Sequence, residues 1–282
     1  FYVGDLFYVY SADGAQASFT ISGTAHLNVW FLPGTASQTI PASIVTASAG
    51  KWTAADIARG CAVIIVEYKA NDKVWSGGRP NFKFQLEGMK LYDPRIDSTV
   101  PGGSGLHRFA DPTTWSYSTN LALMSYNFLR GVYNGDELMV GPGLSADEAP
   151  GEDWIAAINA CDTAIPLKAG GTQLAYHGGA MIRSDEPFID VLENFAQCMG
   201  GMIVPTRGGV LIQPGFGQSV VASITDADIV EGTPIIFSGF LDKNNRVNTV
   251  IGRYVEPYQF WEVTSAPMRR DYADVTLSLI HI

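Results

Sequence analysis

The densest group of residues that could carry chemistry is an acidic run in the second half of the chain. Asp147, Glu148, Glu152 and Asp153 lie close together in this run. Two carboxylates about 5–10 Å apart suffice for glycoside hydrolysis. The run sits in a loop rich in Pro and Gly, however, and its aromatic neighbour Trp154 falls on the core side of a predicted helix. We therefore favour a solvated loop, and we keep glycan hydrolysis as the alternative.

The histidines and the glycine-rich loop at 102–105 form no recognisable catalytic arrangement. His26, His107 and His177 occur outside any H-E-x-x-H pattern. A nucleophile elbow needs G-x-S-x-G directly after a strand, and the loop at 102–105 (GGSG) lacks both the pattern and the strand. We expect ordinary loop or strand roles for His107 and His177, and we assign no catalytic residue.

No metal or cofactor site is predicted. Asp242 and Asn244 have the spacing of calcium ligands, but the Gly and the terminal Glu of an EF-hand loop are missing. A tight turn explains this stretch better. The glycine pairs at 77–78 and 208–209 do not follow a strand and open a helix as a phosphate-binding loop would. We interpret both pairs as hairpin turns.

The three cysteines are Cys61, Cys161 and Cys198, and they are widely spaced. Zinc sites need C-x-x-C or comparable Cys/His spacings, which this sequence does not have. Each cysteine lies in an apolar run. We therefore predict that all three are small buried hydrophobic residues.

The composition limits the class of partner. The chain of 282 residues has a net charge of −10, and only 16% of its residues are charged, against about 25% in a typical soluble protein. Nine acidic and two basic residues give the stretch 141–200 a charge of −7. Because phosphate binding needs clustered Lys and Arg, we expect no specific nucleic-acid binding. The apolar runs are also too short for a transmembrane segment.

Low surface charge is typical of a subunit that buries much of itself against neighbours. It is equally typical of a β-rich monomer whose surface is Ser, Thr, Asn and Gly. A secreted carbohydrate-binding β-module is therefore a third hypothesis from a different class, beside the glycan hydrolase and an assembly subunit.

The elements that must position these residues begin with β-structure, which is predicted from the start to about residue 91. Short runs rich in Val, Ile, Phe and Tyr are separated there by turn residues. The continuous apolar run at 61–68 predicts a strand covered on both faces. In residues 80–87 apolar and polar side chains alternate, as in a strand with one buried face. After Gly88 the apolar residues change to the other face, which is typical of a β-bulge. One short helical turn is expected at 53–60.

Three helices and a hairpin follow a flexible, glycine-rich gap. Ser118 and Ser184 are the predicted caps of the first and third helices, and the glycines at 200–201 end the third. The resulting prediction is an α+β chain with a helical segment between two β stretches. The predicted bounds are 121–132, 152–160 and 188–199 for the helices, 202–213 for the hairpin, and 235–255 with 261–263 for the closing β stretch.

Several strings occur in a particular order along the chain. They are LEGMKLYDPR at 86–95, DPTTWSYSTN at 111–120, ACD at 160–162, the Gly-Gly hairpin at 200–213, DKNNRVN at 242–248 and YVEP at 254–257. Taken in this order, they resemble the central region of phage tail-tip proteins, the family of the tip attachment (host-specificity) protein J and related phage tail proteins, over roughly residues 60–272. Leu121 stands where family members often have Pro, which leaves the helix intact because Leu is a good helix former.

The resemblance implies a structural subunit of a virion, not an enzyme. It implies a tail-tip or baseplate hub that closes the tail tube, commonly as a homotrimer, in contact with the distal tail and tape measure proteins. Host-receptor binding would belong to regions outside this chain. The hub domains would be β-rich and barrel-like, and built partly from discontinuous segments.

The domain organisation that we predict has three parts. A β-rich hub or barrel domain is expected at 1–112, within which 1–60 matches none of the strings and could be a separate insertion. An α+β hub domain is expected at 113–232, and the chain returns to the β-rich hub domain at 233–282. Because the chain lacks an initiator Met and ends inside a strand-like run, we expect an excerpt of a longer protein. The closing LSLIHI at 277–282 differs in its sequence pattern from the residues before it, and we expect it to be a sequencing or assembly artefact.

Overall fold

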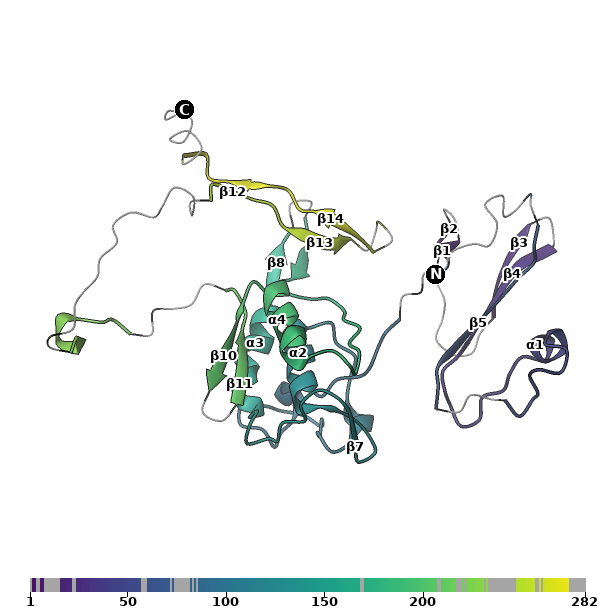
Figure 1. Ribbon diagram of the computed structural model, residues 1–282, viewed down its shortest axis with the longest axis horizontal. Coiled ribbons are helices and arrows are strands. Elements are labelled where there is room, and N and C mark those ends of the chain that lie inside the picture. Colours follow the sequence, from purple (N-terminus) through teal and green to yellow (C-terminus); the bar gives the residue numbers. More distant parts are fainter. Residues whose placement is uncertain are drawn as a thin grey trace. The chain divides into compact units, whose positions relative to one another are not determined.

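A computed structural model describes most of the chain, and it divides the chain into two compact units. One unit comprises Phe1–Leu86 with Ile236–Ile282, and the other is Glu87–Ile235. Four α-helices and small antiparallel sheets make up the described part (Figure 1), which confirms the α+β prediction, and this part contains no closed barrel. The described residues are 2–3, 6–7, 16–21, 24–56, 60–71, 73, 82, 84, 86–167, 170–206, 209–216, 220, 222–230, 232, 247–256, 259 and 261–273.

A three-stranded antiparallel sheet is the main element of the first unit. Its order is β3 (Gln16–Ile21), β4 (Thr24–Leu32) and β5 (Val63–Tyr68). The central strand β4 buries consecutive residues, including Leu27, Val29 and Trp30, so both of its faces are covered. The edge strand β5 is only half-buried. A strand is confirmed at 63–68, but the expectation that both of its faces are covered was wrong, because β4 and not β5 is the central strand.

Helix α1 (Ala42–Ala47) was not expected from the sequence, since its β-branched residues favour a strand. It begins after Pro41, whose carbonyl oxygen accepts hydrogen bonds from the backbone N–H groups of Ile44 and Val45. The predicted helical turn at 53–60 is a tight turn in its described part. There the Asp56 carboxylate accepts hydrogen bonds from the backbone and the hydroxyl of Thr53, and 57–59 lie outside the described residues.

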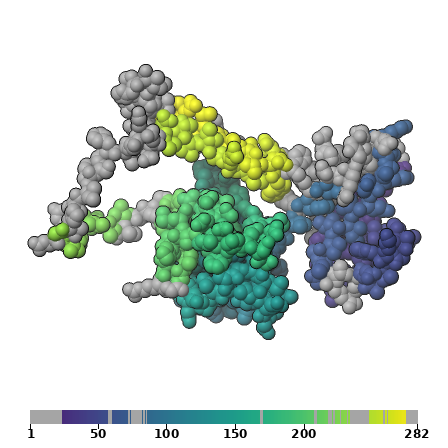
Figure 2. Space-filling model, in the orientation of Figure 1, coloured from purple at the N-terminus to yellow at the C-terminus, as the bar shows by residue number. Residues whose placement is uncertain are grey.

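The second unit contains the three helices and the hairpin that were predicted. The helices are α2 (Leu121–Arg130), α3 (Gly151–Cys161) and α4 (Phe188–Cys198). The hairpin of β10 (Met202–Thr206) and β11 (Gly209–Gln213) runs alongside them. The space-filling view shows these residues, coloured teal to green, as one continuous body (Figure 2).

The caps of two helices differ from the prediction. Asn120 caps α2, because its Oδ1 accepts a hydrogen bond from the Leu123 backbone N–H at 2.9 Å, while Ser118 Oγ accepts from the Asn120 N–H. Helix α4 follows Pro187 and has no side-chain cap, so the assignment of Ser184 was wrong. The end of α4 was predicted correctly: Gly200 adopts a φ of +56°, which favours glycine.

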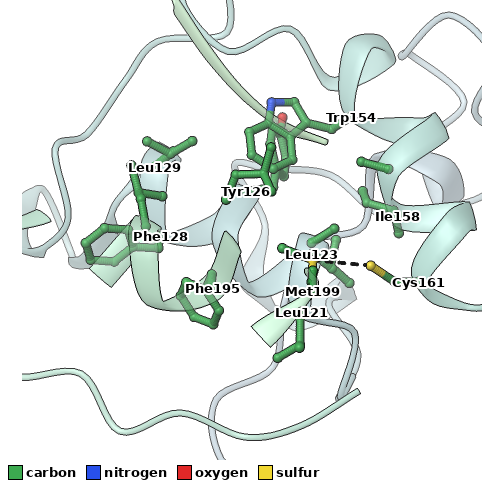
Figure 3. Close-up of a cluster of buried hydrophobic side chains, with 14 of the residues drawn as sticks. Leu121, Leu123, Tyr126, Phe128, Leu129, Trp154, Ile158, Cys161, Phe195 and Met199 are labelled. Atoms are coloured by element: carbon green, nitrogen blue, oxygen red, sulfur yellow. Dashed lines mark hydrogen bonds between the residues drawn. The ribbon is translucent and has the colours of Figure 1, made fainter. Parts of the chain in front are cut away.

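Helix α2 is the centre of the core, and nine of its ten residues are buried. Figure 3 shows side chains of α2, α3 and α4 gathered in one cluster, and the ring centroids of Tyr126 and Trp154 lie 5.5 Å apart. Cys161 Sγ lies 3.5 Å from Met199 Sδ. The buried cluster runs from Leu91 to Ile212, and all of its members belong to the second unit.

Residues 87–112 pack with the helices, although the prediction assigned them to the preceding β-rich domain. Leu91 and Tyr92 join the buried cluster around α2, and the 3₁₀ helix η1 (Pro94–Ile96) contacts α3. The described residues of 80–90 form no regular strand, and 80, 81, 83 and 85 lie outside the described part. The strand and the bulge expected there are therefore not observed in the described residues.

Two further hairpins of the second unit were not predicted. Helix α2 ends at Arg130, two residues earlier than expected, because Gly131 adopts a φ of +90°. The chain then turns into the first of these hairpins, in which β6 (Val132–Asn134) pairs with β7 (Glu137–Val140). In the second hairpin β8 (Ala164–Pro166) pairs with β9 (Thr172–Leu174).

The remaining elements are short. The predicted closing β stretch is present as hairpin strands, while 233–246 lie outside the described residues. In the described part of the chain, each helix is too short or too polar to cross a membrane. The remaining elements are β1 (Tyr2–Val3), β2 (Leu6–Phe7), η2 (Pro112–Thr114), η3 (Asp226–Asp228), β12 (Thr249–Val250), β13 (Arg253–Glu256), β14 (Glu262–Ser265) and β15 (Arg269–Arg270).

Candidate functional site

The polar residues of the second unit are organised around Arg95, which lies within η1. Its Nε and NH2 groups donate hydrogen bonds to both carboxylate oxygens of Asp93, at 2.7–3.1 Å. Its NH1 group donates to Asp162 at 2.7 Å and to Asn159 at 3.1 Å, at the end of α3. A guanidinium can bind two acceptors in this way because its N–H groups form a planar fork. Arg95 therefore ties the loop before η1 to the C-terminus of α3.

A second polar group surrounds Asp97. Its carboxylate accepts hydrogen bonds from the Tyr92 hydroxyl at 2.8 Å, from the Thr99 backbone and hydroxyl, and from Arg108 at 2.9 Å. Burial acts to raise the pKa of Asp97, but the hydrogen bonds from Thr99 and Tyr92 and the Arg108 charge outweigh it, so the pKa is lowered. A carboxyl held ionised in this way is unsuited to donating a proton at neutral pH.

The side chain of Asn127 on α2 forms hydrogen bonds with backbone groups of two segments. Its Oδ1 accepts a hydrogen bond from the Tyr92 N–H, and its Nδ2 donates to the Tyr92 and Leu123 carbonyl oxygens, at 2.8–2.9 Å. In the same way, Asn120 Nδ2 donates to the Ile158 carbonyl oxygen of α3 at 2.8 Å. Buried amides that are fully hydrogen-bonded hold specific segments together. These groups are used for structure and are not free for catalysis.

A pocket of about 580 Å³ opens beside the Asp97 group, and all of its lining residues belong to the second unit. Three aromatic rings contribute to its wall, those of Tyr92, Phe109 and Tyr126. Arg130, at the end of α2, stacks on Phe109 with 3.9 Å from Cζ to the ring centroid. Burial raises the pKa of Tyr126, so this hydroxyl stays protonated and accepts a hydrogen bond from Arg130 at 3.0 Å.

Only part of the acidic run at 147–153 lines this pocket. Asp147 and Glu152 line it, while Glu148 turns back on its own loop and accepts hydrogen bonds from the Ser145 backbone and hydroxyl. These hydrogen bonds lower the pKa of Glu148. Trp154 is buried in the core, as its helical position predicted. The run therefore lies next to aromatic side chains that its local sequence does not contain.

The histidines are not brought together. His107 is buried, and its Nδ1 accepts a hydrogen bond from the Asp93 backbone N–H at 3.1 Å. His177 is exposed, with Nδ1 3.1 Å from the Leu174 carbonyl oxygen. His26 lies in β4 of the other unit. Within the described ranges, no three His, Cys, Asp or Glu side chains are grouped as metal ligands, and the calcium-like pair at 242 and 244 lies outside these ranges.

The glycine-rich segments have ordinary structural roles where the structure describes them. The loop at 102–105 folds back on η1, with the Ser104 N–H donating to the Arg95 carbonyl oxygen and the Gly103 N–H to that of Val100. The pair at 77–78 lies outside the described residues, as does Gly208. Gly209 begins β11 opposite Thr206, the last residue of β10, so this glycine lies at the end of the hairpin as predicted.

The cysteines correct one expectation. Cys161 is buried, and burial raises the pKa of its thiol to about 11. Cys61 and Cys198 are exposed, so the prediction that all three are buried was wrong for these two. Cys61 lies before the start of β5. Cys198 lies on the exposed face of α4, whereas the next residue, Met199, is buried.

Sequence reasoning singled out two acidic residues of the pocket, Asp147 and Glu152, but not its aromatic and basic residues. Arg130 and Tyr126 are four positions apart on α2, so helical spacing alone places them on one face. Phe109 comes from a loop without periodicity, and no local signal brings it to this helix. Comparison with models of known families and with curated proteins finds no match to the chain.

Proposed function

We propose that the chain is a structural subunit of the tail-tip hub of a bacteriophage, and that it acts by assembly and not by catalysis. The observation that carries the proposal is the use of the polar residues in the tail-tip-like strings. Arg95 donates hydrogen bonds to Asp93 of its own string and to Asp162 of another, and Asn120 of a third caps α2. These residues maintain the fold of the second unit, as expected for a scaffold.

We further propose the assembly that the resemblance implies. The chain would form a homotrimer with barrel-like β-rich hub domains that closes the tail tube of the virion. Its partners would be the distal tail and tape measure proteins, and regions outside this chain would reach the host receptor.

The hairpins of the second unit offer surfaces for such contacts. Two-stranded hairpins are marginally stable by themselves, and their strands have unpaired edges. Exposed apolar side chains lie on them, including Leu138 and Met139 on β7 and Met202 on β10. Burying these side chains against a neighbouring subunit would stabilise both the hairpins and the assembly.

Light scattering on the chain, expressed with the sequence that flanks it in its gene, tests the proposal. We expect a mass corresponding to three chains. Met139→Lys or Met202→Lys should shift the mass towards one chain, because a charge then replaces an apolar contact. Met181→Lys is the matched control, since Met181 is exposed in a loop outside the hairpins. An extended chain that stays monomeric at every concentration would contradict the proposal.

A glycan hydrolase of the tail is the second candidate, and one observation favours it. Asp147 and Glu152 line a pocket that also contains aromatic rings, the arrangement that a sugar would require. Incubation with peptidoglycan distinguishes the two functions. Saccharide release that is abolished by Asp147→Asn or Glu152→Gln would establish the hydrolase and overturn the purely structural proposal.

A further inference from the structure

Arg130 is a buried cation that has no carboxylate partner among the residues that the structure describes. Its side chain lies at the end of α2, and the residue is 8% exposed. Nε donates a hydrogen bond to the Leu144 carbonyl oxygen at 2.9 Å, and NH1 donates to the Tyr126 hydroxyl at 3.0 Å. The remaining N–H groups of the guanidinium have no acceptor among the described residues, and none of these residues forms an ion pair with it. Buried charges in proteins are usually paired, because their desolvation is costly.

The other charges of the pocket do not neutralise Arg130. Asp97 is already bonded to Arg108, Tyr92 and Thr99. Asp147 and Glu152 are exposed, and neither forms a hydrogen bond or an ion pair with a described residue. Apart from the Asp97–Arg108 pair, the charged residues of the pocket are therefore one buried cation and two exposed carboxylates.

The surroundings of Arg130 favour a ligand with an apolar part. The ring of Phe109 covers one face of the guanidinium, which leaves its edge for hydrogen bonds. Val100, Pro101 and Ala146 supply apolar wall. The N-terminus of α3 at Gly151 also lines the pocket without a side-chain cap, and its dipole adds to the attraction for a negative group.

We infer that this pocket binds a single carboxylate carried on an apolar or aromatic body, with the Arg130 guanidinium as the recognising group. A carboxylate matches the planar fork of the guanidinium. Phosphate carries more negative charge, so Asp147 and Glu152 would repel it more strongly. The inference rests on the pocket alone and does not depend on the hub assignment.

Calorimetry tests the inference by measuring how matched small probes bind to the whole chain. The probes are 3-phenylpropionate, 2-phenylethylamine and inorganic phosphate. We expect 3-phenylpropionate to bind with a Kd on the order of a millimolar, and the amine and phosphate to bind at least about tenfold more weakly. The amine has the same ring without the carboxylate, so it reports on the two exposed acids.

Two peptides distinguish the sources of the carboxylate. One ends in a phenylalanine with a free carboxylate, and the other is its C-terminal amide. If the free acid binds more tightly than 3-phenylpropionate and the amide does not bind, the natural ligand is the end of a protein chain. If 3-phenylpropionate binds more tightly, it is a small molecule. Both results support recognition of a carboxylate.

Variants connect the binding to the pocket. Arg130→Gln should weaken the binding of 3-phenylpropionate by about tenfold to a hundredfold. Because Arg130 is buried and this variant could unfold, Ala146→Phe provides a second test: Ala146 is exposed, and a ring there would fill the pocket. Arg183→Gln is the control, since Arg183 pairs with Asp185 on the surface. The inference is overturned if 3-phenylpropionate does not bind, if the amine or phosphate binds more tightly, or if folded variants of Arg130 and Ala146 both bind like the wild type.

Discussion

We expect the loss of Arg95 to destabilise the second unit, because Arg95 pairs with a buried carboxylate. Its side chain is 24% exposed, while that of its partner Asp93 is 4% exposed. In Arg95→Met the Asp93 carboxylate stays buried without its cation, which costs about 3–5 kcal/mol for a fully buried pair. We expect about 2–3 kcal/mol here, because water reaches part of the guanidinium. Urea denaturation followed by circular dichroism measures the difference.

The surface pair of Arg183 and Asp185 is the matched control for this experiment. Its two side chains are 69% and 67% exposed. Arg183→Met should therefore change the free energy of unfolding by no more than about 0.5 kcal/mol. Similar losses in the Arg95 and Arg183 variants would show that the network around Arg95 does not hold the unit together.

The stability of the chain should depend on pH through Asp97. Because the folded pKa is lowered, the ionised carboxylate stabilises the folded state above its unfolded pKa of about 3.9. This contribution is lost as the pH falls through the lower folded value. We expect Asp97→Asn to be about 2 kcal/mol less stable than wild type at pH 7. The gap should narrow in acid, as measured by urea midpoints between pH 7 and pH 2.

Asp185→Asn separates this effect from general acid unfolding, because Asp185 is exposed and contributes only to the background titration. The difference between this variant and wild type should stay nearly constant with pH. An Asp97→Asn variant whose deficit is also constant down to pH 2 would exclude the assigned role of the ionised carboxylate.

At the scale of single residues, sequence reasoning singled out the strings but did not predict which of their residues contact one another. Arg95 and Asp162 both lie in strings that we singled out, yet their contact joins positions 67 apart and depends on where α3 ends. The cysteines show a second limit. An apolar run predicts burial, but a helix buries only one face, so Met199 is buried and the adjacent Cys198 is exposed.

At the scale of elements, Asn120 joins two helices. It caps α2 through its side-chain oxygen, and it donates from its side-chain nitrogen to the Ile158 carbonyl oxygen of α3. Asn120→Ala removes the cap, worth about 1 kcal/mol, and leaves a buried carbonyl without its donor. We expect a total loss of about 2 kcal/mol, measured as a shift of the urea midpoint.

Two further variants divide the two roles of Asn120. Asn120→Ser should keep the cap and lose the contact with Ile158, which gives an intermediate stability. Ser118→Ala tests the cap that was expected from the sequence, and it should cost less than Asn120→Ala because Ser118 accepts only from the Asn120 N–H. A larger effect at Ser118 than at Asn120 would contradict the observed capping.

The elements that sequence reasoning found are those with long, regular patterns. α3 and α4 have apolar residues at helical spacing, and both helices are present in the fold. The acidic residues of the first turn are Glu152 and Asp153 in α3, and Asp190 in α4. The hairpins β6–β7 and β8–β9 have strands of three or four residues, too short for a period to be seen. Helix α1 was missed because Pro41 starts a helix whose own residues favour strands.

At the scale of the whole molecule, the division of the chain follows the packing and not the composition. The β-like pattern that runs to about residue 91 led us to place 87–112 in one domain with the residues before it. Its side chains Leu91 and Tyr92 are instead buried against α2, which places this stretch with the helices. Composition could not predict this boundary, because burial of these two residues depends on a helix that begins thirty positions later.

The last prediction is that the second unit folds without the first. All members of its buried cluster lie between Leu91 and Ile212, so the segment 87–216 contains the complete core. We expect this segment to unfold cooperatively on heating and to keep the near-ultraviolet circular dichroism of its packed aromatic side chains. Met199→Ala, at a fully buried position, should cost about 2–5 kcal/mol both in the segment and in the whole chain. A segment with helical signal but no aromatic signal, or a Met199→Ala cost that differs between the two contexts, would mean that the core of the second unit depends on residues outside it.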